Sequence, residues 1–144
     1  MANYMGFTRT NYFSVTDAEK LRDIVDRIIW DNSGSFLEEG YGGYVFGCYG
    51  SINGLRNPKQ EDCDSEDYDD DYNADDVYEA LQEIVAPGDA IIITEVGYEK
   101  LRYLVGDTVV ITRDAIEYIN LRSAAMEAAC KLLNNPQFDT QMEY

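Results

Sequence analysis

The stretch AIIITEV at residues 90–96 is an almost continuous apolar run in a chain that is otherwise rich in charge. A run of this length with three successive isoleucines is typical of a β-strand that is covered on both faces. We therefore expect it to lie at the centre of a sheet, with neighbouring elements supplying the rest of the core.

Upstream of this strand, the sequence predicts a helix. Asn73 is a preferred helix N-cap residue, and apolar side chains recur at helical spacing over residues 77–85. Pro87 and Gly88 follow, and we expect them to end the helix.

Downstream, the sequence predicts further strands and a last helix. Residues 100–105 and 108–112 are strand candidates, and the Gly-Asp pair between them fits a tight hairpin turn. Apolar and polar side chains alternate imperfectly over residues 115–121. This pattern fits a strand or a helix, and we favour the strand. Residues 123–133 carry an apolar stripe at helical spacing, which predicts a helix.

The first part of the chain predicts a strand followed by a helix. Aromatic, Thr and apolar residues mix over residues 4–15, as is common in strands. Thr16 and Glu19 match the capping-box pattern, and apolar residues then recur at helical spacing. We expect a helix over residues 17–30.

A hairpin is expected next. Residues 36–39 and 44–49 are strand candidates, and the Gly-Tyr-Gly-Gly stretch between them suits the turn. Residues 51–59 contain Gly, Asn and Pro but show no periodicity, so we expect a loop there.

These elements give the order β-α-β-β-α-β-β-β-α, with most strands joined by hairpins. Such an order predicts an α+β fold with an antiparallel or mixed sheet and about three helices packed on one face. The length of 144 residues is usual for one domain. We expect a single domain over residues 1–144, with an acidic insertion at residues 61–76.

The acidic residues are concentrated in this insertion. The chain holds 28 Asp and Glu against 11 Lys and Arg, a net charge of -17. Residues 1–60 contain 7 acids and 6 bases, residues 61–76 contain 10 acids and no base, and residues 77–144 contain 11 acids and 5 bases. The negative electric field of such a chain repels nucleic acids and anionic membranes and attracts basic surfaces. A basic protein is therefore the expected partner.

The chain lacks residues that several functions require. The chain has no histidine, the usual general base and the commonest transition-metal ligand, so we expect neither an enzyme nor a cofactor. The three cysteines are far apart, and no apolar run has the length of a membrane span or the setting of a secretion signal. A reducing, cytoplasmic location is expected.

Carboxylates are also the oxygen ligands that Ca²⁺ prefers, so the insertion needs comparison with a calcium-binding EF-hand loop. A register that starts at Asp62 places Asp67 where glycine is required and Asn73 where a bidentate Glu should stand. An EF-hand is therefore excluded. Looser divalent-cation binding stays an alternative, as does a solvated loop of self-repelling charges.

The acids continue from the insertion onto the predicted helix, where they stabilise the first turn and gain a fixed spacing. Carboxylates at fixed spacing imitate the phosphates of a nucleic acid, and tyrosine rings stack on arginine. The candidate partner-binding residues are Glu61, Asp62, Asp64, Glu66, Asp67, Tyr68, Asp69, Asp70, Asp71, Tyr72, Asp75, Asp76, Glu79 and Glu83.

In size, in acidity and in the tyrosine-containing acidic run of residues 61–76 with Glu79 and Glu83, the chain resembles the DNA-mimic inhibitors of phages and mobile elements. These include anti-restriction and anti-CRISPR proteins, and the resemblance is one of general character. It implies an inhibitor that blocks the DNA- or RNA-binding cleft of a CRISPR-Cas nuclease or a restriction enzyme in the host cytoplasm.

Two alternatives concern the partner and the assembly. The chain could equally be an acidic partner or chaperone of another basic protein. Added DNA or RNA would not displace such a protein from the chain. Trp30, Phe36 and the tyrosines of residues 41–49 are candidates for an apolar docking or dimerisation patch, although core packing also explains them. The sequence leaves both a monomer and a homodimer open.

Overall fold

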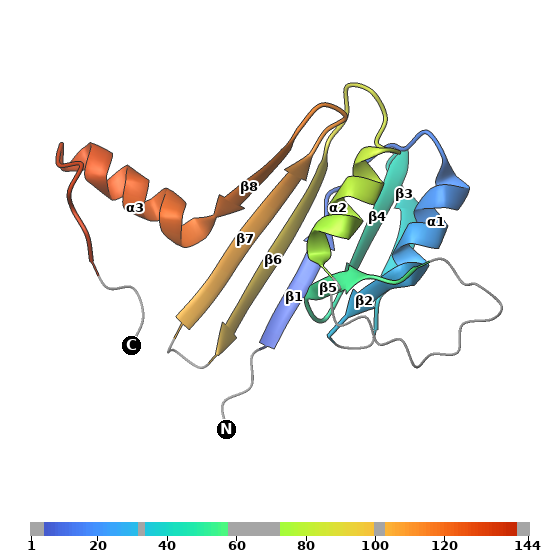
Figure 1. Cartoon of the computed structure of the whole chain (residues 1–144), viewed down its shortest axis with the longest axis horizontal. Helices are drawn as coiled ribbons and strands as arrows, with labels where there is room; N and C mark the ends of the chain where they lie inside the picture. Colours follow the sequence, from blue (N-terminus) through green and yellow to red (C-terminus); the bar gives the residue numbers. More distant parts are fainter. Residues whose placement is uncertain (1–4, 32–33, 58–72, 100–102, 141–144) are drawn as a thin grey trace.

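The computed structural model describes residues 5–31, 34–57, 73–99 and 103–140. These residues form a six-stranded sheet, a separate pair of short strands and three helices (Figure 1). The strand order in the sheet is β3-β4-β1-β6-β7-β8, and every neighbouring pair is antiparallel. The α+β class predicted from the sequence is therefore confirmed.

The strands of the large sheet are β1 (Met5–Thr10), β3 (Phe36–Gly40), β4 (Gly43–Cys48), β6 (Ile91–Glu99), β7 (Tyr103–Ile111) and β8 (Ile116–Asn120). The short pair consists of β2 (Ile28–Trp30) and β5 (Ile52–Leu55). The helices are α1 (Ala18–Arg27), α2 (Ala74–Gln82) and α3 (Leu121–Leu132).

One face of the sheet, which we call the core face, packs against α1 and α2. Side chains alternate between the two faces of a strand, so each strand sends every second residue into this core. The hydrophobic core includes buried side chains from the sheet and from both helices, among them Phe46, Ile91, Ile93, Val109, Ile111, Leu21, Ile24, Val77 and Leu81. Burial of these apolar groups holds the two helices in place.

The first helix is shorter than the sequence predicts. It ends at Arg27, because Ile28 has the extended backbone angles φ -63° and ψ 130°. Ile28–Trp30 instead pairs with Ile52–Leu55, which lies within the segment 51–59 where the sequence predicts a loop. This pairing joins segments that are far apart in the sequence, and β-branched Ile favours strands.

The strand β7 also differs from its prediction. Gly106 and Asp107 do not form a turn, because β7 runs through them without a break and pairs with β6 from Tyr103 to Ile111. A hairpin turn at Gly106 and Asp107 would end the pairing of β7 with β6 halfway along β6. The two strand candidates on either side of the Gly-Asp pair are therefore parts of one strand.

The strand β6 is central in the sheet, as predicted, but only one of its faces is buried. Ile91 and Ile93 point into the core and are 0% and 3% exposed, whereas Ile92 and Val96 are 37% and 50% exposed. We call the face that carries Ile92 and Val96 the outer face. The prediction of burial on both faces is wrong, since antiparallel sheets commonly leave one face uncovered.

The helix α3 does not join α1 and α2 over the core face. It extends from the end of β8 away from those two helices (Figure 1). None of its residues is buried. Two helices thus cover the core face, one fewer than the sequence predicts.

Candidate functional site

The predicted partner-binding residues fall into two groups. The ten candidates between Glu61 and Tyr72 lie outside the described residues, as does most of the predicted acidic insertion. The other four candidates lie on α2 or at its C-cap, and all four are exposed: Asp75, Asp76, Glu79 and Glu83.

The start of α2 is held by the N-cap that the sequence predicts. The side-chain oxygen of Asn73 accepts a hydrogen bond from the backbone N–H of Asp75 across 3.0 Å. Asp75 and Asp76 occupy the first turn, where each carboxylate stabilises the helix by about 0.3–1 kcal/mol. Val77 and Leu81 on the opposite side are fully buried, so the acids project from a firmly anchored helix.

A tyrosine from the edge of the sheet contacts this acidic turn. The hydroxyl group of Tyr118 on β8 donates a hydrogen bond to a carboxylate oxygen of Asp75 across 2.8 Å. The ring of Tyr118 also meets Tyr78 of α2 edge to face, with ring centroids 6.0 Å apart. The hydrogen bond to Asp75, together with partial burial, raises the pKa of Tyr118.

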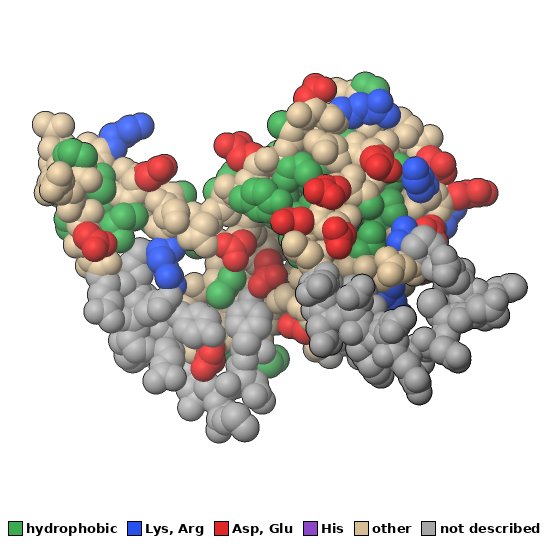
Figure 2. Space-filling model, viewed as in Figure 1, with side chains coloured by type: hydrophobic (Ala, Val, Ile, Leu, Met, Phe, Trp, Pro, Cys, Tyr) green, Lys and Arg blue, Asp and Glu red, His purple; other side chains and the backbone are tan. Residues whose placement is uncertain are grey.

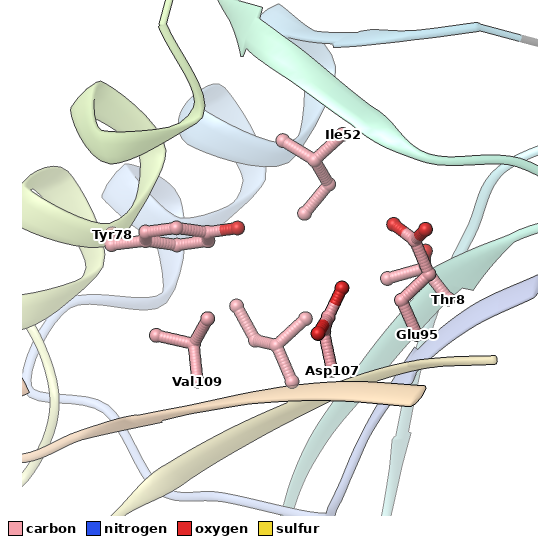
Figure 3. A pocket seen from close by; sticks show the side chains of 7 residues that line it. Thr8, Ile52, Tyr78, Glu95, Asp107 and Val109 are labelled. Atoms are coloured by element: carbon pink, nitrogen blue, oxygen red, sulfur yellow. The ribbon is translucent and has the colours of Figure 1, made fainter. Parts of the chain in front are cut away.

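Beside these tyrosines, a cavity of about 100 Å³ lies between α2 and the core face of the sheet (Figure 3). Its polar lining comes from Tyr78 of α2, Thr8 of β1, Glu95 of β6 and Asp107 of β7. Figure 3 shows the hydroxyl end of Tyr78 and the two carboxylates directed into this space. Glu95 and Asp107 are direct cross-strand partners, so two acids stand side by side on the cavity floor.

The electrostatics of the cavity centre on Tyr78. Burial raises the pKa of this phenol to about 12, and the negative charges of Glu95, Asp75 and Asp107 add to the effect. The phenol therefore stays neutral at physiological pH and can donate a hydrogen bond. Acids from α2, β6 and β7 act on one side chain, so they form a single negative site.

The sequence did not single out Glu95 or Asp107 as site residues. Glu95 is the one charged residue within the apolar run at 90–96, and a charge at such a position is a usable signal. Asp107 gives no such signal, because a Gly-Asp pair between two strand candidates favours a turn. Only the ladder between β6 and β7 brings these two carboxylates together.

The acids form part of a broader charged surface. Figure 2 shows acidic side chains gathered over the part of the molecule where α2 lies, whereas basic side chains are fewer on this face. Lys20 of α1 forms a 3.6 Å ion pair with Glu83, and both side chains are exposed. An exposed pair of this kind contributes at most about 1 kcal/mol, so Glu83 can exchange Lys20 for another basic group.

Comparison of the chain with protein-family models, with curated proteins and with solved structures finds no match. Within the described ranges, no three His, Cys, Asp or Glu side chains are placed to hold a metal ion. No helix in those ranges is long and apolar enough to cross a membrane. The described residues define an α+β protein with an acidic site between a helix and a sheet.

Proposed function

We propose that the chain is an inhibitor that occupies the basic nucleic-acid-binding cleft of a host-defence enzyme, either a CRISPR-Cas nuclease or a restriction enzyme, in the host cytoplasm. The observation that carries the proposal is the position of the acids on α2. Asp75, Asp76 and Glu79 are exposed on an anchored helix at the end of a segment with ten acids and no base. Asp75 acts electrostatically on Tyr78 together with Glu95 and Asp107, which line the cavity beside that tyrosine.

The spacing of the acids supports a short mimic of nucleic acid. Asp76, Glu79 and Glu83 are three and four residues apart, which corresponds to about 4.5 and 6 Å along the helix axis. One strand of duplex DNA carries a charge about every 3.4 Å along its axis. The helix alone is thus less densely charged than DNA, and Glu95 and Asp107 add charge beside it. Such a surface suits one cleft better than a whole duplex.

The cavity suits the end of a basic side chain from the partner. Glu95 and Asp107 supply acceptor oxygens, and the rings of Tyr78 and Tyr118 lie beside them. Arginine binds carboxylates through paired hydrogen bonds and also stacks on aromatic rings. The cavity has a volume of about 100 Å³, and its paired carboxylates suit a guanidinium group.

The partner class is tested by capture at two salt concentrations. The full chain is immobilised and offered purified Cas nucleases, restriction enzymes and a host lysate. The proposal expects a nucleic-acid-binding enzyme that is captured at low salt, released at high salt and displaced by added DNA or RNA. A captured basic protein that nucleic acid does not displace would assign the chain to the chaperone alternative. Capture that does not depend on the salt concentration would refute both the inhibitor and the chaperone hypotheses.

The site itself is tested with charge-neutral variants. Asp76→Asn combined with Glu79→Gln removes two charges from α2 and is expected to weaken binding by about tenfold, or about 1.4 kcal/mol, at low salt. Glu38→Gln combined with Glu39→Gln is the matched control, because both residues are exposed on β3, at the other end of the sheet. Equal losses in the two double variants would show that net charge matters and the α2 site does not.

A further inference from the structure

The outer face of the sheet exposes a group of neighbouring apolar side chains. Phe7 on β1, Val96 and Tyr98 on β6, and Leu104 on β7 are 42–66% exposed, and the strand register places them side by side. Soluble monomers rarely expose more than a few hundred square ångströms of contiguous apolar surface. A surface of this kind marks a docking site.

The outer face is shaped to receive an elongated apolar element. Two shallow grooves, of about 360 and 570 Å³, lie on it and have Phe7 and Val96 in common, so they adjoin each other. The larger groove is also lined by Leu121, the first residue of α3. The apolar surface of the sheet therefore continues onto the helix.

The helix α3 carries an exposed apolar stripe of its own. Leu121, Ala125, Ala128 and Leu132 follow one another at intervals of four, three and four residues, which places them along one side of the helix. All four are exposed, and Leu132 is 86% exposed. Among the described residues, Leu121 lies against the sheet at Gly106, and Ala125, Ala128 and Leu132 beyond it are exposed.

The chain cannot close these two surfaces on each other. Helix α3 follows β8 without an intervening residue, and Asn120 fixes the junction because its side-chain oxygen accepts a hydrogen bond from the N–H of Ser123 across 3.0 Å. The side chain of Leu121 lies against the backbone of Gly106 on the outer face, and the rest of the helix leads away from the sheet (Figure 1). The described residues therefore leave the outer face and the end of α3 uncovered.

We infer that the outer face binds a second copy of this chain, in a two-fold symmetric dimer in which α3 of each copy lies in the outer-face groove of the other. A second copy supplies both missing parts, an apolar helix for the groove and an apolar groove for the helix. Every contact is made twice in such a dimer, which helps it to reach the roughly 800 Å² per partner that specific interfaces bury.

The distribution of charge favours a second copy as the occupant. A chain of net charge -17 repels itself everywhere except where its acids are sparse. The outer-face positions of β1, β6, β7 and β8 include one acid, Glu117, and one base, Arg9. Helix α3 has two bases, Arg122 and Lys131, and one acid, Glu127, so neither side of the proposed contact carries the excess of acids that repels two copies elsewhere.

The dimer is tested by measuring the mass of the full chain in solution at several concentrations and salt levels. A dimer is expected at micromolar concentration, and it should strengthen as salt rises, because salt screens the repulsion between two acidic copies. Binding to the basic enzyme proposed above should weaken with salt, so the failure of one proposal is distinguishable from the failure of the other. A chain that stays monomeric at about 100 μM would overturn the inference and leave another occupant for the groove.

Two single variants test the exchange of helices. Leu104→Glu places a charge in the groove and Leu132→Glu places one on the helix, both at exposed positions that the fold tolerates. Each variant alone is expected to shift the dissociation constant upward by at least tenfold. Tyr41→Glu, in the turn between β3 and β4, is the matched control, since Tyr41 is 91% exposed and lies outside this surface.

A mixture of the two variants distinguishes a dimer with exchanged α3 helices from a dimer in which two sheets pack face to face. In a mixed dimer, α3 of the Leu104→Glu copy meets the unaltered groove of the Leu132→Glu copy, so one of the two contacts is intact. Mixed dimers should therefore outnumber the dimers of either variant in native mass spectrometry. If Leu132→Glu dimerises as well as the natural chain, the helix does not take part and the inference is wrong.

Discussion

Tyr118 and Asp75 are 43 residues apart in the sequence, and their side chains meet in a 2.8 Å hydrogen bond between β8 and the first turn of α2. The phenol donates and the carboxylate accepts. The bond fixes one carboxylate of the acidic site relative to the sheet. Next to it, the ring of Tyr118 packs edge to face against Tyr78 of α2. The edge of the sheet therefore helps to orient the site.

Removing this hydroxyl group should loosen the site with little effect on the fold. Both partners are exposed, so Tyr118→Phe is expected to lower the free energy of unfolding by less than about 1 kcal/mol, measured by urea denaturation. Partner binding should weaken as well, because the Asp75 carboxylate gains freedom. Tyr41→Phe is the control, since Tyr41 lies in the turn after β3, at the opposite edge of the sheet from β8. Identical binding by both variants would show that the Tyr118–Asp75 bond does not orient the site.

The raised pKa of Tyr78 predicts a loss of stability at high pH. Its folded-state pKa is about 12, against 10.0 for an ordinary tyrosine, so the unfolded chain releases the proton first as the pH rises. The contribution of this neutral phenol is complete below pH 10 and declines between pH 10 and about pH 12. The midpoint of urea unfolding should fall across this window.

Tyr78→Phe provides the comparison for this pH window, because phenylalanine keeps the ring and has no proton to release. The variant should show a shallower fall in the unfolding midpoint than the natural chain. Parallel curves for the two proteins would mean that other tyrosines cause the loss of stability. A phenolate absorbance titration of both proteins identifies the group directly.

Local sequence signals predicted the helices well. Asn73 caps α2 as expected, because an Asn side chain satisfies N–H groups within a few residues of itself. At α1 the cap is Asp17, which accepts a hydrogen bond from the N–H of Lys20, and not the neighbouring Thr16. An error of one residue is expected where two adjacent residues are both good caps.

The errors arose where distant segments decide the structure. Ile28–Trp30 becomes a strand because β5 lies beside it, and Gly106 stays extended because β6 pairs along its whole length. The acidic site depends on the same kind of contact, since Glu95 and Asp107 meet only through that ladder. Local patterning therefore places Asp75, Asp76 and Glu79 on a helix, but it gives no sign that Glu95 and Asp107 lie together.

Asn120 links the acidic site to α3, and its two functions are separable. The side-chain oxygen caps α3 at the N–H of Ser123, while the side-chain nitrogen donates to the Asp107 carboxylate. Asn120→Ala removes both bonds and is expected to cost about 1 kcal/mol of stability, together with some helical signal in circular dichroism. Asn120→Asp keeps the cap acceptor and places a second carboxylate beside Asp107.

The aspartate variant should therefore retain the helical signal and acquire a new pH dependence. Repulsion between the two carboxylates raises the pKa of one of them in the folded state, so the variant is most stable at acid pH and loses stability as the pH rises through that pKa. Relative to the natural chain, it should be destabilised at pH 7 and recover below about pH 4. A destabilisation that is the same at both pH values would show that the side chain at position 120 does not contact Asp107, and that the cap alone holds α3.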